Sequence, residues 1–205
     1  LRRQRQMCIR DSSSIEEQGK LTEELKQQIE KAQTLVVVDD LYRPYRPKRR
    51  TRAIIAKEKG LEPLANLILL QQVTHPIEEE AKAYLNEEKE VHTVEGAIAG
   101  AKDIIAEHIS DEAAYRMHIR KQTEKEGMML SEAKDENAES VYEMYYHFEE
   151  PIQKLAGHRI LALNRGEKEK ILTVKVQAPK DRILSYLEKK VIVAQNPYTT
   201  PILRE

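Results

Sequence analysis

The sequence predicts a mainly α-helical protein, in which a multi-helix N-terminal region with helix-turn-helix-like units is followed by a small α+β segment. Three observations support this fold class. Apolar residues recur at helical spacing in several segments, most clearly from Thr93 to Ile109. Threonines precede several of these segments, where they are typical helix N-caps. Apolar and polar residues alternate at 171–177, which is typical of a half-buried strand.

The first part of the chain is predicted to form short helices separated by capping and breaking residues. Thr22 caps a helix that reaches about Ala32. Residues 35–38 (Leu-Val-Val-Val) fit either a strand or one face of a helix, and we favour the helix. Pro44 and Pro47 then exclude regular helix, because each lacks an amide donor and restricts the residue before it. The segment around them is therefore expected to be an extended or turn-like loop.

Two further short helices are predicted on either side of Gly60. Thr51 caps a helix over residues 52–59, and Gly60 suits the left-handed position that follows it. The next helix starts at Glu62. Two short helices that meet at a glycine resemble a helix-turn-helix unit at a coarse level only.

Longer helices are predicted in the middle of the chain. They begin at Pro76, at Thr93 and at about Asp111, and Gly127 ends the last of them. Gly96 and Gly100 lie four residues apart in the second of these helices, which indicates the close approach of a neighbouring helix.

Beyond Gly127 the pattern is mixed. Residues 131–140 are acidic and polar and are expected to form a loop, and residues 141–148 carry apolar side chains at helical spacing. The strand at 171–177 needs a partner for its backbone groups, and residues 191–193 are the best other candidate. We therefore expect a helical region over 14–150 and an incomplete α+β segment over 151–205, belonging to a longer protein.

Composition limits the function classes. The 205 residues carry a net charge of −1, with 40% hydrophobic and 34% charged residues and a single cysteine, Cys8. No apolar stretch is long enough for a membrane helix, and one cysteine excludes an internal disulfide framework. The six histidines lack metal-ligand spacing, and no phosphate-binding loop or nucleophile elbow is present. These features predict a non-enzymatic cytoplasmic protein without a metal or cofactor.

The basic loop, residues 43–52 (RPYRPKRRTR), is the most informative segment. It contains six cations and no acid, although the chain as a whole is almost neutral. Dense positive charge held by prolines suits a phosphate backbone, and a neighbouring tyrosine could stack on a base or sugar. The predicted nucleic-acid-binding residues here are Arg43, Arg46, Lys48, Arg49, Arg50 and Arg52, with Tyr42 and Tyr45. The alternatives are that the arginines pair with acids of adjacent helices, or that the tyrosines are packing anchors.

A second candidate segment is residues 157–167 (GHRILALNRGE). Arg159 and Arg165 could bind a phosphate or an acidic partner surface, and Gly166 is expected to stop a helix. Structural ion pairs that fix this turn are an equally acceptable explanation. Residues 1–13, by contrast, resemble one reading frame of an adapter used in sequencing libraries. They are predicted to be a non-native leader without a function.

Five longer motifs follow one another along the chain: SIEEQGKLT (14–22), DLYRPYRPKRRTRA (40–53), EKGLEPLA (58–65), GAKDIIAE (100–107) and HRILALNRGE (158–167). In this order they resemble the Tex-type transcription accessory proteins, which are bacterial nucleic-acid-binding factors with an S1 RNA-binding domain. The resemblance extends from Ser14 almost to the C-terminus.

The resemblance implies a factor that acts with the transcription machinery and binds RNA or DNA. Such proteins combine a helical N-terminal region with ribonuclease-H-like, helix-hairpin-helix and S1 modules, and this chain resembles only the helical N-terminal and central part. The first hypothesis is therefore a non-enzymatic transcription accessory factor with the basic loop as a polyanion contact. The alternative is a helical scaffold whose basic loop docks the missing C-terminal domains or RNA polymerase.

Overall fold

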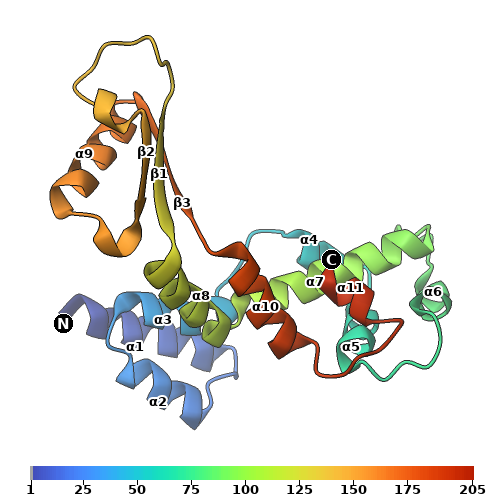
Figure 1. Ribbon diagram of the computed structural model, residues 1–205. Helices are drawn as coiled ribbons and strands as arrows, with labels where there is room; N and C mark the ends of the chain where they lie inside the picture. The colour runs from blue at the N-terminus through green and yellow to red at the C-terminus, as the bar shows by residue number, and fades with distance from the viewer. Residues whose placement is uncertain (1) are drawn as a thin grey trace. The chain divides into compact units, whose positions relative to one another are not determined.

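The computed structural model describes residues 2–205, with side chains from Gln6 onward (Figure 1). This part of the chain forms eleven α-helices, short 3-10 turns and one three-stranded antiparallel sheet. It therefore confirms a mainly α-helical chain with a small α+β segment. The helices are α1 Arg2–Glu17, α2 Glu23–Lys31, α3 Leu35–Tyr42, α4 Arg52–Glu58, α5 Glu62–Leu70, α6 Ile77–Ala81, α7 Val94–Asp111, α8 Ala113–Glu126, α9 Gly157–Lys168, α10 Lys180–Val191 and α11 Thr200–Arg204. The strands are β1 Met128–Ala133, β2 His147–Pro151 and β3 Leu172–Gln177.

The chain divides into two compact units. The helical unit contains the residues up to Met117 together with Tyr186–Glu205, and the sheet unit is His118–Ser185. The division into a helical region over 14–150 and an α+β segment over 151–205 stays a prediction. Its expected boundary lies within the sheet unit. The non-native origin of residues 1–13 also stays a prediction; those of them that are described belong to α1. None of the helices described within 2–205 combines the length and apolar character needed to cross a membrane.

Threonine caps define the helix starts in the helical unit, as the sequence predicts. The side chain of Thr22 accepts a hydrogen bond from the amide of Leu25 at 3.2 Å, and Thr51 accepts one from Ile54 at the same distance. Thr93 caps α7 in the same way. Residues 35–38 form the first turn of α3, so the favoured helical interpretation is confirmed.

The helical unit has two apolar clusters. One joins α1, α2 and α3 through Ile15, Ile29, Val38 and Leu41. The other joins α4 to α7 with the C-terminal segment. The predicted close approach is confirmed at Gly100 of α7, where an added Cβ would lie 2.4 Å from Leu61 Cδ1.

Gln71 ties the returning chain to the helical unit. It ends α5 in the left-handed conformation, with φ of 55°, and it is buried. Its side-chain amide donates to the carbonyl of Val191 at 2.7 Å, and its side-chain oxygen accepts from the amides of Val193 and Ala194 at 3.1 Å. Asn196 adds a hydrogen bond to the Gln71 carbonyl at 3.2 Å. The segment 191–196 is therefore held against the end of α5.

The sheet unit is a three-stranded sheet of order β2-β1-β3, with α9 packed against it (Figure 1). Its core contains Tyr142, Tyr145, Tyr146, Leu163 and Leu172. The predicted strand at 171–177 is therefore confirmed as β3. Its partner is β1 rather than residues 191–193, which lie at the end of α10 and just after it. The sequence of β1, MMLSEA, has a modest preference for strands, so its conformation depends on the two neighbours that pair with it.

The loop expected over residues 131–140 begins only after Ala133, because residues 131–133 belong to β1. Two other expectations in this unit are wrong. Residues 141–148 form a 3-10 turn and the start of β2 instead of a helix, because backbone pairing with β1 outweighs helical periodicity. Tyr145 of the predicted stripe is buried, but Val141 and Met144 are exposed, and Tyr142 and Tyr146 are buried in their place. Gly166 does not stop α9. It lies inside the helix, where an added Cβ would be 2.6 Å from Leu172 Cδ1, so its role is close packing.

Candidate nucleic-acid interface

The basic loop connects α3 to α4 within the helical unit. Arg43 to Tyr45 form a 3-10 turn, residues 46–51 are irregular, and Arg52 is the first residue of α4. Pro44 and Pro47 limit the backbone of this segment, and Thr51 fixes its end by capping α4. The loop is thus held by local sequence at both ends.

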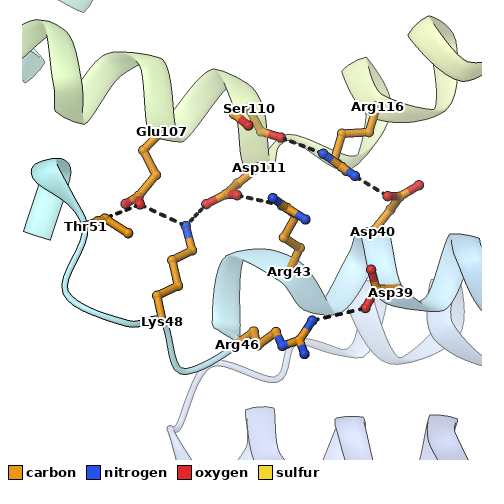
Figure 2. Close-up of polar contacts among 10 residues, drawn as sticks. All are labelled: Asp39, Asp40, Arg43, Arg46, Lys48, Thr51, Glu107, Ser110, Asp111 and Arg116. Carbon is orange, nitrogen blue, oxygen red and sulfur yellow. Dashed lines mark hydrogen bonds and ion pairs between the residues drawn. The ribbon is translucent and has the colours of Figure 1, made fainter. Parts of the chain in front are cut away.

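Two of its cations reach the C-terminal end of α7 (Figure 2). The ammonium of Lys48 contacts both Asp111 and Glu107, the latter at 3.3 Å. The guanidinium of Arg43 donates to Asp111 at 3.1 Å. These side chains are only partly accessible, with 23% of Lys48 and 39% of Arg43 exposed. We call Arg43 and Lys48 the inner cations.

The inner cations reduce a charge repulsion between two carboxylates of α7. Glu107 and Asp111 are four residues apart on one helix face, where like charges repel, and they lie near the negative end of the helix dipole. Lys48 lies between the two carboxylates and contacts both, as Figure 2 shows, and Arg43 brings a second positive charge to Asp111. Glu107 also accepts a hydrogen bond from the Thr51 hydroxyl at 2.9 Å. Arg43, Lys48 and Thr51 therefore anchor the loop to the C-terminal end of α7.

Next to the inner cations, an arginine at the start of α8 connects that helix to α3. The Arg116 guanidinium donates to the buried carboxylate of Asp40 at 2.8 Å and to the carbonyl of Ser110 at 3.4 Å. Figure 2 shows these contacts beside the inner cations. Ion pairs thus hold α3, the basic loop and the α7–α8 junction in one arrangement.

The other four cations of the loop, Arg46, Arg49, Arg50 and Arg52, are exposed, and we call them the outer cations. Three have carboxylate partners: Arg46 with Asp39 at 3.7 Å, Arg50 with Glu58 at 2.8 Å and Arg52 with Asp103 at 3.4 Å. Their side chains remain 61%, 70% and 86% exposed, respectively. Arg49 makes no hydrogen bond or ion pair with another residue of the described chain.

Pairing with acids of adjacent helices, the alternative considered for this loop, thus describes five of the six cations. The consequence differs between the two groups. An exposed ion pair contributes only about 0–1 kcal/mol, so a phosphate can replace the carboxylate at an outer cation with little loss. If an inner cation moved to a phosphate, it would leave the partly buried carboxylate of Glu107 or Asp111 without a partner. The free-energy cost of this exchange is higher than at an outer cation. The outer cations alone remain candidates for phosphate contact.

The two tyrosines of the predicted site are packing residues. Tyr42 and Tyr45 lie against the cluster of Ile15, Ile29 and Val38. The hydroxyl of Tyr42 is 3.2 Å from that of Ser14. Tyr45 also lines a groove of about 540 Å³ between the loop and α4, α5 and α7. Their positions match the interpretation as packing anchors.

Arg159 and Arg165 belong to the sheet unit and lie on α9. Arg159 pairs with Glu150 of β2 at 2.7 Å and lies 5.8 Å from the centre of the Phe148 ring, which fits the structural alternative. Arg165 is exposed and lies six positions further along the helix, about 120° around its axis. The two arginines therefore do not form one phosphate-binding face.

Near Arg165, burial together with a hydrogen bond to Glu169 and the charge of that carboxylate raises the pKa of Tyr142, and Arg165 opposes this shift. The positive charge of Arg165 therefore has an electrostatic effect within its own unit, on the buried Tyr142. In the described part of the chain, no three His, Cys, Asp or Glu side chains gather closely enough to hold a metal ion.

The acidic partners were missed by sequence reasoning. Glu107 and Asp111 carried one usable signal, their spacing of four at the end of a strongly periodic helix. Nothing in the sequence connects Arg52 with Asp103 or Arg43 with Asp111, because these pairs are formed by tertiary packing of α4 and the loop on α7.

The fold and the loop together define a class of protein, a helical module with an anchored cationic loop and an appended α+β unit. Comparison with known families is specific. The family model described as Tex central region-like matches residues 72–197, which is more than half of the chain. The chain belongs to the Tex family. The basic loop lies N-terminal to the matched range.

Curated relatives agree with this assignment. The chain is 51% identical over 194 residues to the uncharacterized protein YdcI of Bacillus subtilis (strain 168), covering 93% of this chain and 27% of that protein. It is 42% identical over 166 residues to Protein tex of Bordetella pertussis, covering 80% and 21%. It is 36% identical over 187 residues to the Transcriptional accessory protein Tex of Neisseria gonorrhoeae, covering 89% and 24%. The chain thus spans about a quarter of the length of these relatives.

Proposed function

We propose that this chain is part of a non-enzymatic, cytoplasmic transcription accessory factor and that its outer cations contact the phosphates of a nucleic acid. The transcription role is supported by membership of the Tex family and by the printed name of the Neisseria gonorrhoeae relative. The proposed phosphate contact is supported by one observation. An exposed group of arginines lies on a loop that Lys48 and Arg43 anchor to α7.

Anchoring matters because a fixed group of charges loses little freedom on binding. Each long side chain that is immobilised costs about 0.5–1.5 kcal/mol, and a flexible loop adds the cost of ordering its backbone. Here the inner cations and the Thr51 cap already order the backbone. The favourable free energy of phosphate contact then comes mainly from counterions that are released from the nucleic acid. Binding should therefore depend strongly on salt.

The test is the salt dependence of binding by the whole chain. A fluorescent nucleic acid of mixed sequence is titrated from about 50 to 200 mM salt, with fluorescence anisotropy as the readout. Replacing Arg49 and Arg50 together by Ala should weaken binding and flatten the plot of log K against log salt by up to about 1.8, if both contact a B-form duplex.

The matched control removes two exposed cations of the same unit that lie outside the loop, Lys26 and Lys82. If K26A/K82A changes affinity and slope as much as R49A/R50A does, the effect is one of net charge and the basic loop is not the site. An unchanged slope in R49A/R50A would contradict the proposal directly.

A second function is favoured by the ion pairs themselves. Five cations of the loop already bind carboxylates that project from helices. An acidic helix of another domain, or of RNA polymerase, could use the outer cations in the same way, which makes the chain a docking scaffold. In that case the chain ignores nucleic acid at about physiological salt, where charge interactions are screened beyond roughly 8 Å, and binds the remaining part of the longer protein added in trans.

A further inference from the structure

We propose that the basic loop recognises the backbone of a double-stranded nucleic acid and not a single strand. This inference rests on the proposed function, because it concerns the polyanion that the outer cations contact. Its basis is the combination of exposed arginines with tyrosines that are engaged elsewhere.

Proteins that bind single strands usually provide aromatic rings on which bases stack, each worth about 1–3 kcal/mol. The two tyrosine rings beside this loop are half-buried by packing against the protein. Tyr42 and Tyr45 both pack against the α1–α3 cluster, and the Tyr42 hydroxyl is 3.2 Å from that of Ser14. Tyr45 is further fixed through its carbonyl, which accepts a hydrogen bond from the Gln18 side chain at 2.9 Å. A base stacked on the packed side of either ring would have to displace contacts with this cluster.

Without stacking, affinity has to come from phosphates, and charge density then decides between the two forms. A duplex carries one charge per about 1.7 Å of its axis, and each neutralised phosphate releases more counterion than on a single strand. Four outer cations correspond to a slope of up to about −3.6 on a B-form duplex and about −2.8 on a single strand. The loop therefore gains more from a duplex.

The fixed backbone of the loop favours the same form. The inner cations, Pro44, Pro47 and the Thr51 cap hold the outer cations in one arrangement. A duplex presents its phosphates in a regular, stiff array, whereas a single strand must be ordered at the moment of binding. A rigid cationic surface thus fits a rigid polyanion.

The experiment compares four probes of one mixed sequence: a DNA duplex, an RNA duplex, and a single strand of each. The whole chain is titrated at about 50 mM salt, where phosphate contacts dominate. We expect at least one duplex to bind several-fold more tightly than both single strands. The DNA and RNA arms identify which duplex carries the phosphate array that fits.

Two variants separate the inference from the proposed function. Tyr45→Leu keeps an apolar side chain against the α1–α3 cluster and should leave all four affinities unchanged. R49A/R50A should reduce duplex binding toward the single-strand value. Single strands that bind as tightly as both duplexes, or that lose affinity in Tyr45→Leu, would overturn the duplex inference while leaving a role for the arginines. If R49A/R50A changes none of the probes, the proposed function itself is wrong.

Discussion

The carboxylates that face the outer cations should act as competitors of phosphate. Arg50 is bound to Glu58 and Arg52 to Asp103 in the protein alone. A nucleic acid has to displace these carboxylates or share the guanidinium with them. Removing their charge by Glu58→Gln and Asp103→Asn should therefore strengthen nucleic-acid binding, although neither substitution adds a cation.

The magnitude follows from the exposure of the two pairs. Both arginines are more than two-thirds exposed, and their acidic partners are 53% and 30% exposed, for Glu58 and Asp103 respectively. Pairs of this kind are worth about 0.2–1 kcal/mol each. Losing both competitors should thus raise affinity by about 0.4–2 kcal/mol, which is about 2-fold to 30-fold. The gain should shrink as salt is added, since exposed charges are screened.

Anisotropy titration of the double variant against the unchanged chain measures this effect at low salt. The control carries the same change of net charge at Glu87 and Glu88, which are exposed acids of the helical unit outside the loop contacts. Thermal unfolding checks that both variants stay folded. An affinity that does not rise in E58Q/D103N, or that rises equally in E87Q/E88Q, would refute the idea that local carboxylates compete with phosphate.

Three further predictions concern stability, and thermal unfolding followed by circular dichroism measures each. Lys48→Met should lower stability by about 1–3 kcal/mol, because Asp111 loses a partner in a partly buried site; an unchanged midpoint would mean that this contact does not anchor the loop. Gly166→Ala should destabilise by about 1–2 kcal/mol despite a better helix propensity, whereas Gly157→Ala, with open space around the added Cβ, should be neutral or stabilising. Gln71→Ala should cost about 1–3 kcal/mol, because the partly buried hydrogen bonds from the amides of Val193 and Ala194 lose their acceptor. Hydrogen exchange should then show faster exchange at residues 193–194, and unchanged protection there would contradict this assignment.

The helical part was predictable because its signals are local. A threonine cap, a helical stripe and a terminal glycine act within one turn, and Thr51, Gly60 and Thr93 each do what their sequence context predicts. The sheet was less predictable, because strands depend on partners. Residues 141–148 carry a helical pattern yet end in β2, since residues 147–151 pair with β1 and leave Val141 and Met144 of that pattern exposed.

The candidate site shows the same division. Its position on a proline-limited loop and the capping role of Thr51 follow from the sequence. Which cations are engaged does not follow, because the partners of Arg43 and Arg52 are more than 50 residues away along the chain. Sequence reasoning therefore located the charge but could not say how much of it is accessible.

Lys48 and Arg49 are adjacent cations with different surroundings, and this difference explains how one loop can be both stable and free to bind. Lys48 lies between two carboxylates of α7, the helix that packs against α4, α5 and α6 in the larger cluster of the helical unit. The loop backbone is therefore fixed by the same helix that organises the core. Arg49, on that fixed backbone, is exposed and makes no ion pair with the described residues. If all six cations were exposed, no ion pair would hold the loop against α7, and Glu107 and Asp111 would repel each other. If all six were buried in ion pairs, none could reach a phosphate. The phosphate contact that we propose for the outer cations therefore depends on the anchoring of the loop by the inner cations.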